Sequence, residues 1–343
     1  MVIRGPRSRG KAEGWGDTRM IFFQEKLLAK IDKTKIDQIL SNYGNFKVLS
    51  FTPQAGWQNL SLKVETDAGP FILRIYRGRN FRKIENTSSL IDFLAKLGFP
   101  AQKFISAKKA NRVMSVKIGS HNYLVALFEF LPGATKKSLT TGEIVQLGNL
   151  IAALHKTLAS YGRKDDFGRI DVIRMANFVN RKFESSFAGN DKERILWTKF
   201  WFLEGRQLKA SKKTLSQKQL IHGDLAPSNI VFGDSKLSGL LDFDDVIAAP
   251  RVYDLVNFVG NYIQTVKSWG WQDKISEVLK NLLIGYGQVL SLTGKEKELV
   301  PKLLRLWFFR KIIWAKRESA KKYRRRWAKN VIFWCITALK EEF

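Results

Sequence analysis

The stretch LIHGDLAPSNIVFGDSKLSGLLDFDD, residues 220–245, gathers Asp224, Asp242, Asp244 and Asp245 around short apolar runs, in a chain with 59 basic and only 31 acidic residues. His222, Asp224 and Asn229 form the pattern H-x-D-x-x-x-x-N, and Asp242 follows in D-F-D thirteen positions later. In phosphoryl transfer a protein mainly orients a hydroxyl group, holds magnesium on the phosphates and neutralises charge. A carboxylate such as Asp224 can accept the hydroxyl proton, and Asn229 and Asp242 offer the oxygen ligands that magnesium prefers.

The same residue types are also frequent in turns, because Asp and Asn side chains bond to nearby backbone groups and cap helices and hairpins. A chance cluster of turn residues is therefore the structural alternative. We favour the catalytic interpretation because both motifs fall where two predicted lobes meet. For Asp244 and Asp245 two interpretations stay open: a role with a second metal or the substrate, or capping of a hairpin.

The chain changes character along its length. Residues 1–19 are rich in Gly and Arg without apolar periodicity, which predicts a disordered basic tail. Residues 20–131 combine an opening helix with about five strands and a second helix, and residues 132–343 are mainly helical in pattern. The sequence therefore predicts an α+β fold with a sheet-rich N-lobe and a mainly helical C-lobe, and a cleft between lobes is a common ligand site.

Composition excludes several classes of protein. A hydrophobic content of 45% with 12% aromatic residues is typical of a folded chain. The single cysteine, Cys335, excludes an intramolecular disulfide and a cysteine-based zinc site. The longest apolar run near the C-terminus spans residues 331–339. This run is far shorter than the roughly 20 residues that cross a bilayer. We therefore expect a soluble, cytoplasmic protein.

The opening stretch resembles the catalytic core of the aminoglycoside phosphotransferase and choline kinase-like family, which has the protein-kinase-like fold. The resemblance extends to GWQNLSLKVETDAGPFILRIY (56–76), LFEFLPG (127–133), LGNLIAALH (147–155) and APRVYDLVNF (249–258). LLIGYGQVLSLTGKEKELVPKLL (282–304) is similar to the late helices of the homoserine-kinase-like branch. The combined pattern is more specific than H-x-D alone.

This resemblance implies a kinase that uses ATP and Mg²⁺. It implies that Asp224 is the catalytic base and that Asn229 and Asp242 bind the metal. It also implies that His222 orders the catalytic loop and that Asp254 stabilises the loop from within. The residues that it places around the adenine are Glu129, Phe130 and Leu131.

The nucleotide-covering strands depart from the family pattern at two points. Arg74 stands where the family has a phosphate-binding lysine, and a guanidinium group can hold phosphate in a two-pronged way. The helix partner of this position should be a glutamate, for which Glu85 is the candidate, with Thr87 as the alternative aligned residue. The loop PQAGWQN is not a G-x-G-x-x-G, so Gly56 and Asn59 form a reduced phosphate cover.

Much of the formal net charge of +28 lies between Lys302 and Lys329, where there are twelve basic residues and one acid, Glu318. Apolar and Trp residues in this segment recur at near-helical spacing, which predicts a packed helix pair that needs no partner. Two alternatives are binding to an anionic membrane surface and binding to nucleic acid.

The acceptor is expected to be a hydroxyl group of a small molecule. A protein kinase needs a long loop after the metal-binding aspartate as a platform for its peptide, and only residues 246–248 separate Asp245 from the segment APR. We favour a homoserine-like metabolite. The alternatives are an aminoglycoside-modifying kinase, disfavoured because polycations need an acidic cleft, and a catalytically weak nucleotide-binding adaptor with an anion-binding C-terminal segment.

Overall fold

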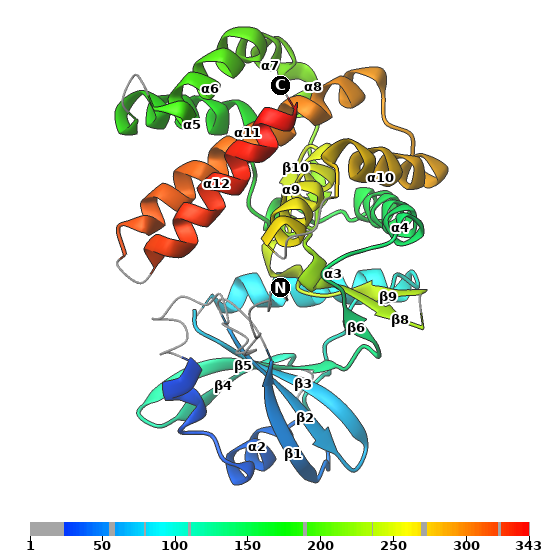
Figure 1. Cartoon of the computed structure of the whole chain (residues 1–343). Coiled ribbons are helices and arrows are strands. Elements are labelled where there is room, and N and C mark those ends of the chain that lie inside the picture. Colours follow the sequence, from blue (N-terminus) through cyan, green and yellow to red (C-terminus); the bar gives the residue numbers. More distant parts are fainter. Residues whose placement is uncertain are drawn as a thin grey trace, which may run out of the picture.

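The computed structural model describes residues 24–54, 59–78, 80–108, 111–187, 191–234, 236–268, 273–321 and 324–342. They form two lobes, a sheet with its flanking helices and a larger helical lobe, as Figure 1 shows. The predicted α+β, two-lobed architecture is confirmed. The predicted disordered tail lies outside the described residues.

The N-lobe is built on a five-stranded antiparallel sheet with strand order β1-β2-β3-β5-β4. Alternating apolar residues in these strands form a buried face; in β2, for example, Leu60, Leu62 and Val64 are all buried. A hairpin through Asp67 and Gly69 joins β2 to β3, and Gly69 has a positive φ of 108°, a conformation that favours glycine. The strands are β1 (Val48–Gln54), β2 (Leu60–Thr66), β3 (Gly69–Tyr76), β4 (Val113–Ile118) and β5 (His121–Glu129).

Two helical parts accompany this sheet. The predicted single opening helix is instead interrupted: residues 24–28 are helical, and α2 (Lys33–Leu40) begins after the N-cap Asp32, whose side chain accepts a hydrogen bond from the Lys35 N–H. An Asp at this position offers the chain a cap in place of a continued helix. Helix α3 (Phe81–Lys96) lies between the sheet and the C-lobe and ends before Gly98.

The C-lobe carries short strands at its junction with the N-lobe and helices beyond them. Strands β8 (Ile230–Gly233) and β9 (Lys236–Leu240) form a hairpin that also pairs with β6 (Ala134–Thr135), and β7 (Gln219–Ile221) pairs with β10 (Ile247–Ala249). The longer helices are α4 (Thr141–Ala159), α5 (Val172–Ser186), α9 (Val252–Ser268), α10 (Ile275–Val289), α11 (Gly294–Ser319) and α12 (Arg325–Glu342). Three shorter ones are α6 (Lys192–Phe200), α7 (Arg206–Ala210) and α8 (Lys212–Ser216).

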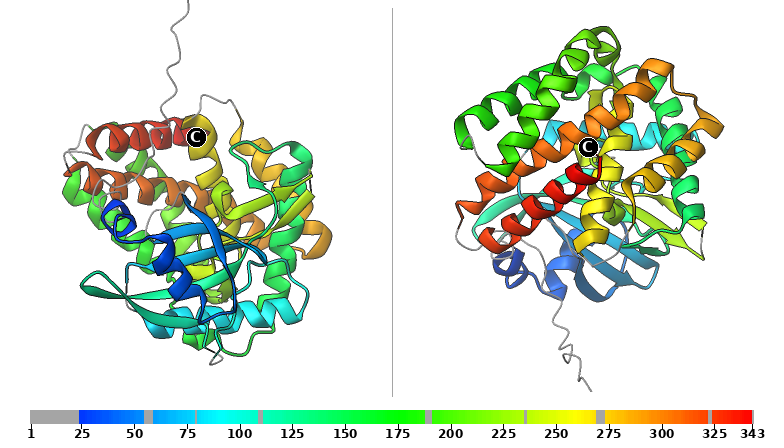
Figure 2. Two further views of the ribbon diagram at one scale, coloured as in Figure 1. Left: turned by 90° about the horizontal axis from the view of Figure 1, so that it is seen from below. Right: turned by 45° about the horizontal axis from the view of Figure 1, so that its top comes forward.

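The basic C-terminal segment forms the last two helices, which run side by side in both views of Figure 2. Helix α12 buries Val331, Cys335 and Leu339, and the Trp314 and Trp327 rings meet edge to face at a centroid distance of 4.9 Å. The predicted helix pair is therefore present and is part of the C-lobe core. Across the described ranges, none of the helices combines the length and the apolar character needed to cross a membrane.

Candidate active site

The catalytic loop follows β7 and is held by α9 beneath it. Both oxygens of the buried Asp254 carboxylate accept backbone hydrogen bonds, from His222 N–H at 2.8 Å and from Gly223 N–H at 2.9 Å. The Asn257 side chain donates to the Gly223 carbonyl at 2.9 Å. Gly223 has φ 83°, and a Cβ there would lie 2.1 Å from the Asp245 carbonyl oxygen. Only glycine fits this turn, and the loop is therefore fixed before any ligand binds.

His222 joins this loop to the segment that carries Asp242. Its Nε2 donates to the Leu241 carbonyl at 2.9 Å, and its Nδ1 accepts a weak hydrogen bond from the Asp224 N–H at 3.4 Å, which is the division of roles in a neutral imidazole. The imidazole is completely buried. It acts between two backbone segments, as expected for a residue that orders the loop.

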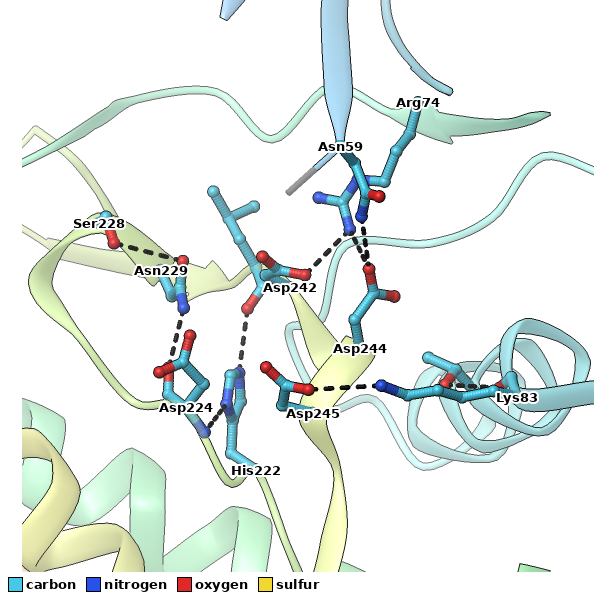
Figure 3. Close-up of polar contacts among 12 residues, drawn as sticks. Asn59, Arg74, Lys83, His222, Asp224, Ser228, Asn229, Asp242, Asp244 and Asp245 are labelled. Carbon is cyan, nitrogen blue, oxygen red and sulfur yellow. Dashed lines mark hydrogen bonds and ion pairs between the residues drawn. The ribbon is translucent and has the colours of Figure 1, made fainter. Parts of the chain in front are cut away.

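Asn229 and Asp224 lie side by side across the loop (Figure 3). The Asn229 amide donates to the Asp224 backbone carbonyl at 2.8 Å. The amide nitrogen of Asn229 is thereby occupied. The amide oxygen points away from Asp224 and accepts a hydrogen bond from the Ser228 hydroxyl at 3.4 Å. The Asp224 carboxylate accepts no hydrogen bond and forms no ion pair within the described residues. Its oxygens are therefore available to a substrate hydroxyl group.

Asp242 stands directly before the short helical turn Phe243–Asp245, in a left-handed backbone conformation with φ 61°. Non-glycine residues adopt this conformation rarely, and such positions cluster at functional sites. The side chains of Asp242 and Asp244 both point toward Arg74, whereas Asp245 points toward Lys83 of α3, with an Nζ–O distance of 3.3 Å. Asp244 and Asp245 thus pair with basic residues of the N-lobe.

Arg74 lies in the middle of β3, opposite Ser61 of β2 and Ala126 of β5, and is 8% exposed. Its Nη1 lies 2.9 Å from Asp242 Oδ1 and 3.1 Å from Asp244 Oδ2. The prediction that Glu85 pairs with Arg74 is wrong, because Arg74 forms its ion pairs with these two aspartates of the C-lobe. Burial disfavours a charged guanidinium group, but the two carboxylates offset this effect and raise the pKa of Arg74, so it stays a cation.

Two carboxylates of the site, those of Asp224 and Asp244, have pKa values above the usual range of an aspartate. Burial raises the pKa of Asp224. Burial, together with the negative charge of Asp242, raises the pKa of Asp244 to about 6, although Arg74 opposes the shift. The cause is the same for both residues: neighbouring carboxylates are crowded into a partly dry site.

The remaining residues predicted to bind the nucleotide lie along the N-lobe side. Asn59 donates to Asp244 Oδ2 at 3.3 Å and accepts from the Arg77 N–H at 3.2 Å, so it is tied to the same aspartate as Arg74. Gly56 lies outside the described residues. Glu129 ends β5 at the passage to the C-lobe, and its carbonyl accepts a hydrogen bond from the Gln102 side chain at 3.0 Å. Phe130 and Leu131 continue this passage, and the Lys63 ammonium group lies 4.5 Å from the Phe130 ring centroid.

The donor set fits magnesium that is completed by phosphates. In the part of the chain that the structure describes, no group of three or more His, Cys, Asp or Glu side chains could hold a metal alone. Mg²⁺ usually takes one or two carboxylates, keeps several waters and binds substrate phosphates. The hard oxygens of Asn229 and Asp242 meet this requirement. A cavity of about 530 Å³ beside the site includes Lys83 and Asp245 in its walls but touches neither Asp224 nor Asn229.

Comparison with known proteins places this geometry in a family. The profile of the family described as "Phosphotransferase enzyme family" matches residues 52–297. The chain belongs to the phosphotransferase enzyme family. The resemblance to the aminoglycoside phosphotransferase group and the prediction of a small-molecule kinase are thereby confirmed.

Curated relatives of this phosphotransferase cover most of its length. A homoserine kinase of Xanthobacter autotrophicus is 27% identical over 276 residues, which are 79% of this chain and 81% of the relative. A homoserine kinase of Chelativorans sp. is 28% identical over 281 residues, 80% of this chain and 82% of the relative.

Solved structures show the same protein-kinase-like fold. A microcompartment-associated aminopropanol kinase matches with a TM-score of 0.70 at 21% identity and covers 90% of this chain and 95% of its own. Amicoumacin kinase hAmiN, solved in complex with AMP-PNP, Ca²⁺ and Ami, matches with a TM-score of 0.66 at 18% identity and with the same coverage.

Two features of the site were missed by sequence reasoning. One is the pairing of Arg74 with Asp242 and Asp244, which joins residues far apart in the chain and leaves no local pattern. The other is Lys311 of α11, whose positive charge acts to lower the pKa of Asp224, against the effect of burial. The basic character of its segment was visible, but not its position relative to the catalytic loop.

Proposed function

We propose that this phosphotransferase transfers the γ-phosphate of ATP to a hydroxyl group of a small metabolite related to homoserine. The observation that carries the proposal is the state of Asp224. Its backbone is held by Asn229 and His222, while its carboxylate accepts no hydrogen bond from the described residues. A free, oriented carboxylate beside two magnesium-type ligands suits a general base and has no use in a purely structural loop.

In this reaction the acceptor hydroxyl gives its proton to Asp224 as its oxygen bonds to the γ-phosphorus. The bond between that phosphorus and the bridging oxygen breaks, and ADP leaves. Asn229 and Asp242 would hold Mg²⁺, which neutralises charge on the phosphates. Arg74 would exchange its aspartate partners for phosphate oxygens, and Glu129, Phe130 and Leu131 would line the adenine site.

The homoserine-like acceptor is supported by the relatives' names and by the short segment after Asp245, which leaves no peptide platform. Two alternatives remain as outcomes of the test. An aminoglycoside-modifying kinase would respond to polycationic antibiotics. A nucleotide-binding adaptor with weak or no transfer would bind ATP without consuming it for any acceptor.

The test is magnesium-dependent ATP consumption by the purified protein with homoserine, choline, methylthioribose, sugars and aminoglycosides. We expect stimulation by homoserine or a close analogue. Asp224→Ala and Asp224→Asn should lower kcat by about 10²- to 10⁴-fold, the usual contribution of a general base, while ATP binding by calorimetry survives.

The matched control is Asp234→Asn, an exposed residue at the turn between β8 and β9 that also has a positive φ, and it should leave turnover unchanged. Full turnover in Asp224→Ala would show that the base is assigned wrongly. Binding of ATP without stimulation by any compound would favour the adaptor.

A further inference from the structure

Lys311 of α11 is a cation held between two indole rings. Its Nζ lies 5.0 Å from the ring centroid of Trp307 and 4.9 Å from that of Trp314, within the range of favourable cation–π contacts. The side chain is half-buried. It forms no hydrogen bond and no ion pair with the described residues, in contrast to Arg305 of the same helix, which pairs with Glu204. A half-buried ammonium group without an anion is costly unless a ligand supplies one.

A chain of contacts fixes this lysine relative to the catalytic loop. Gly223, the neighbour of Asp224, accepts a hydrogen bond from Asn257, and the Asn257 Oδ1 accepts one from the Trp307 indole at 3.0 Å. Trp307 also packs on Gly260 of α9, where an added Cβ would lie 2.6 Å from its ring. Lys311 follows Trp307 by one helical turn on the same face. Its position is therefore set by the loop that carries the base.

The charges of Lys311 and Asp224 also act on each other. Burial lowers the pKa of Lys311, and the neighbouring Cys335 and, to a smaller extent, Asp224 oppose that shift. Asp224 is one of the charged groups that act on Lys311, yet the two side chains do not form an ion pair. They are thus near enough to influence each other without forming an ion pair.

We infer that Lys311 binds a carboxylate of the acceptor while the acceptor's hydroxyl group faces Asp224. This inference rests on the proposed function and deepens it by naming the substrate class: a small hydroxyl compound with a negative group, such as a hydroxy amino acid. It also gives a physical reason against aminoglycosides, because a polycation would meet an unpaired ammonium group at this position.

The same residues could instead bind a cationic acceptor, and the test must distinguish this alternative. Pairs of aromatic rings also bind ligand cations. If Lys311 moved out from between Trp307 and Trp314, the rings could take an amino-alcohol acceptor that has no carboxylate. Because the two rings are already occupied by the lysine, we expect an anionic acceptor.

The experiment compares two acceptors that differ in one group, L-homoserine and 3-amino-1-propanol, which is homoserine without its carboxylate. Wild-type protein should prefer homoserine by at least about tenfold in kcat/KM, the value of one charge-assisted contact. Lys311→Met keeps the aliphatic stem. Its kcat/KM for homoserine should fall about 10- to 100-fold, and its kcat/KM for 3-amino-1-propanol should change little. Lys311→Arg should restore part of the preference.

Lys209→Met is the matched control, because Lys209 also lies over an indole ring, that of Trp201 at 5.0 Å, but is exposed and belongs to α7. It should leave both acceptors unaffected. Equal losses toward both acceptors in Lys311→Met, or a wild-type preference for 3-amino-1-propanol, would overturn the inference.

Failure of the proposed transfer is recognised separately. If wild-type protein phosphorylates neither compound, calorimetry with homoserine, serine and glycerate in the presence of AMP-PNP and Mg²⁺ still decides the role of Lys311. Binding that survives in Asp224→Ala and disappears in Lys311→Met would support the carboxylate site without the transfer reaction. Binding of none of these carboxylates would refute it.

Discussion

Arg74 places a cation on Asp242, the aspartate proposed to bind the metal, before any ligand arrives. One guanidinium nitrogen contacts both Asp242 and Asp244. Two neighbouring carboxylates repel each other, and Arg74 offsets this repulsion in the protein without nucleotide. A lysine has a single ammonium group at this position, whereas the arginine still has a second nitrogen with which to reach a phosphate.

Replacing this residue should therefore change two affinities in opposite directions. In Arg74→Met, the unpaired Asp242 and Asp244 should bind free Mg²⁺ several-fold more tightly, while the KM for ATP should rise about tenfold because a charge-assisted phosphate contact is lost. Calorimetry with Mg²⁺ alone and steady-state kinetics measure the two effects.

The control for this pair of measurements is Lys83→Met. Lys83 pairs with Asp245 at the exposed edge of the site, and a pair of this kind should alter neither value appreciably. Weaker binding of free Mg²⁺ in Arg74→Met would contradict the view that Arg74 competes with the metal for Asp242.

At the scale of elements, helices α4 and α10 cross so closely that only glycines fit. A Cβ at Gly148 would lie 2.2 Å from the Leu282 carbonyl oxygen, and one at Gly285 would lie 1.9 Å from the Val145 carbonyl oxygen. This crossing brings the Tyr286 hydroxyl to 3.0 Å from His155 Nδ1, and His155 Nε2 lies 3.0 Å from Asp254. The helix pair thus supports, through Asp254, the backbone of the catalytic loop.

Gly285→Ala should lower the free energy of unfolding by about 1–3 kcal/mol, because an overpacked contact forces the helices apart. Gly287→Ala is the control on the same helix, since nothing lies within 4 Å of its added Cβ. Alanine's higher helix propensity should stabilise this variant by up to about 1 kcal/mol. Urea unfolding followed by circular dichroism measures both. Similar stability of the two variants would mean that the helices separate without cost.

At the scale of the whole molecule, the basic C-terminal segment is a packed component of the C-lobe. Helix α12 covers α11 and α9 and buries Ala328, Val331, Cys335 and Leu339. Its arginines 325 and 326 are exposed at the start of the helix. Apolar burial and surface charge are therefore divided between two faces of the same helix, and separate variants can test them.

Deletion of residues 320–343 should lower Tm by about 10 °C or more, since several buried apolar side chains lose their partners or are themselves removed. The double variant Arg325→Gln/Arg326→Gln should keep the wild-type Tm. Differential scanning calorimetry measures both, and retention on anionic vesicles and on RNA is measured in parallel. An unchanged Tm after the deletion, with loss of vesicle or RNA retention, would favour the binding alternatives over packing.

The sequence by itself determined the features that arise within single elements. Apolar patterning predicted about five strands in the N-lobe and a mainly helical C-lobe, and the spacing of Asp224, Asn229 and Asp242 marked the two segments that we propose for catalysis and for metal binding. These patterns are local, because strand and helix geometry repeats every few residues and turn residues act on their own backbone. The opening helix was the exception, since the capping effect of Asp32 competed with an otherwise continuous pattern.

Only the tertiary structure decided which charges meet. Arg74 is 168 residues from Asp242, its partner in the other lobe, and the Glu85 expected from a family pattern is not that partner. Lys311 lies on the helix that Trp307 and Asn257 hold against the loop of Asp224. An ion pair or a lysine held between indole rings has no sequence period, because it depends on how whole helices and sheets pack against one another.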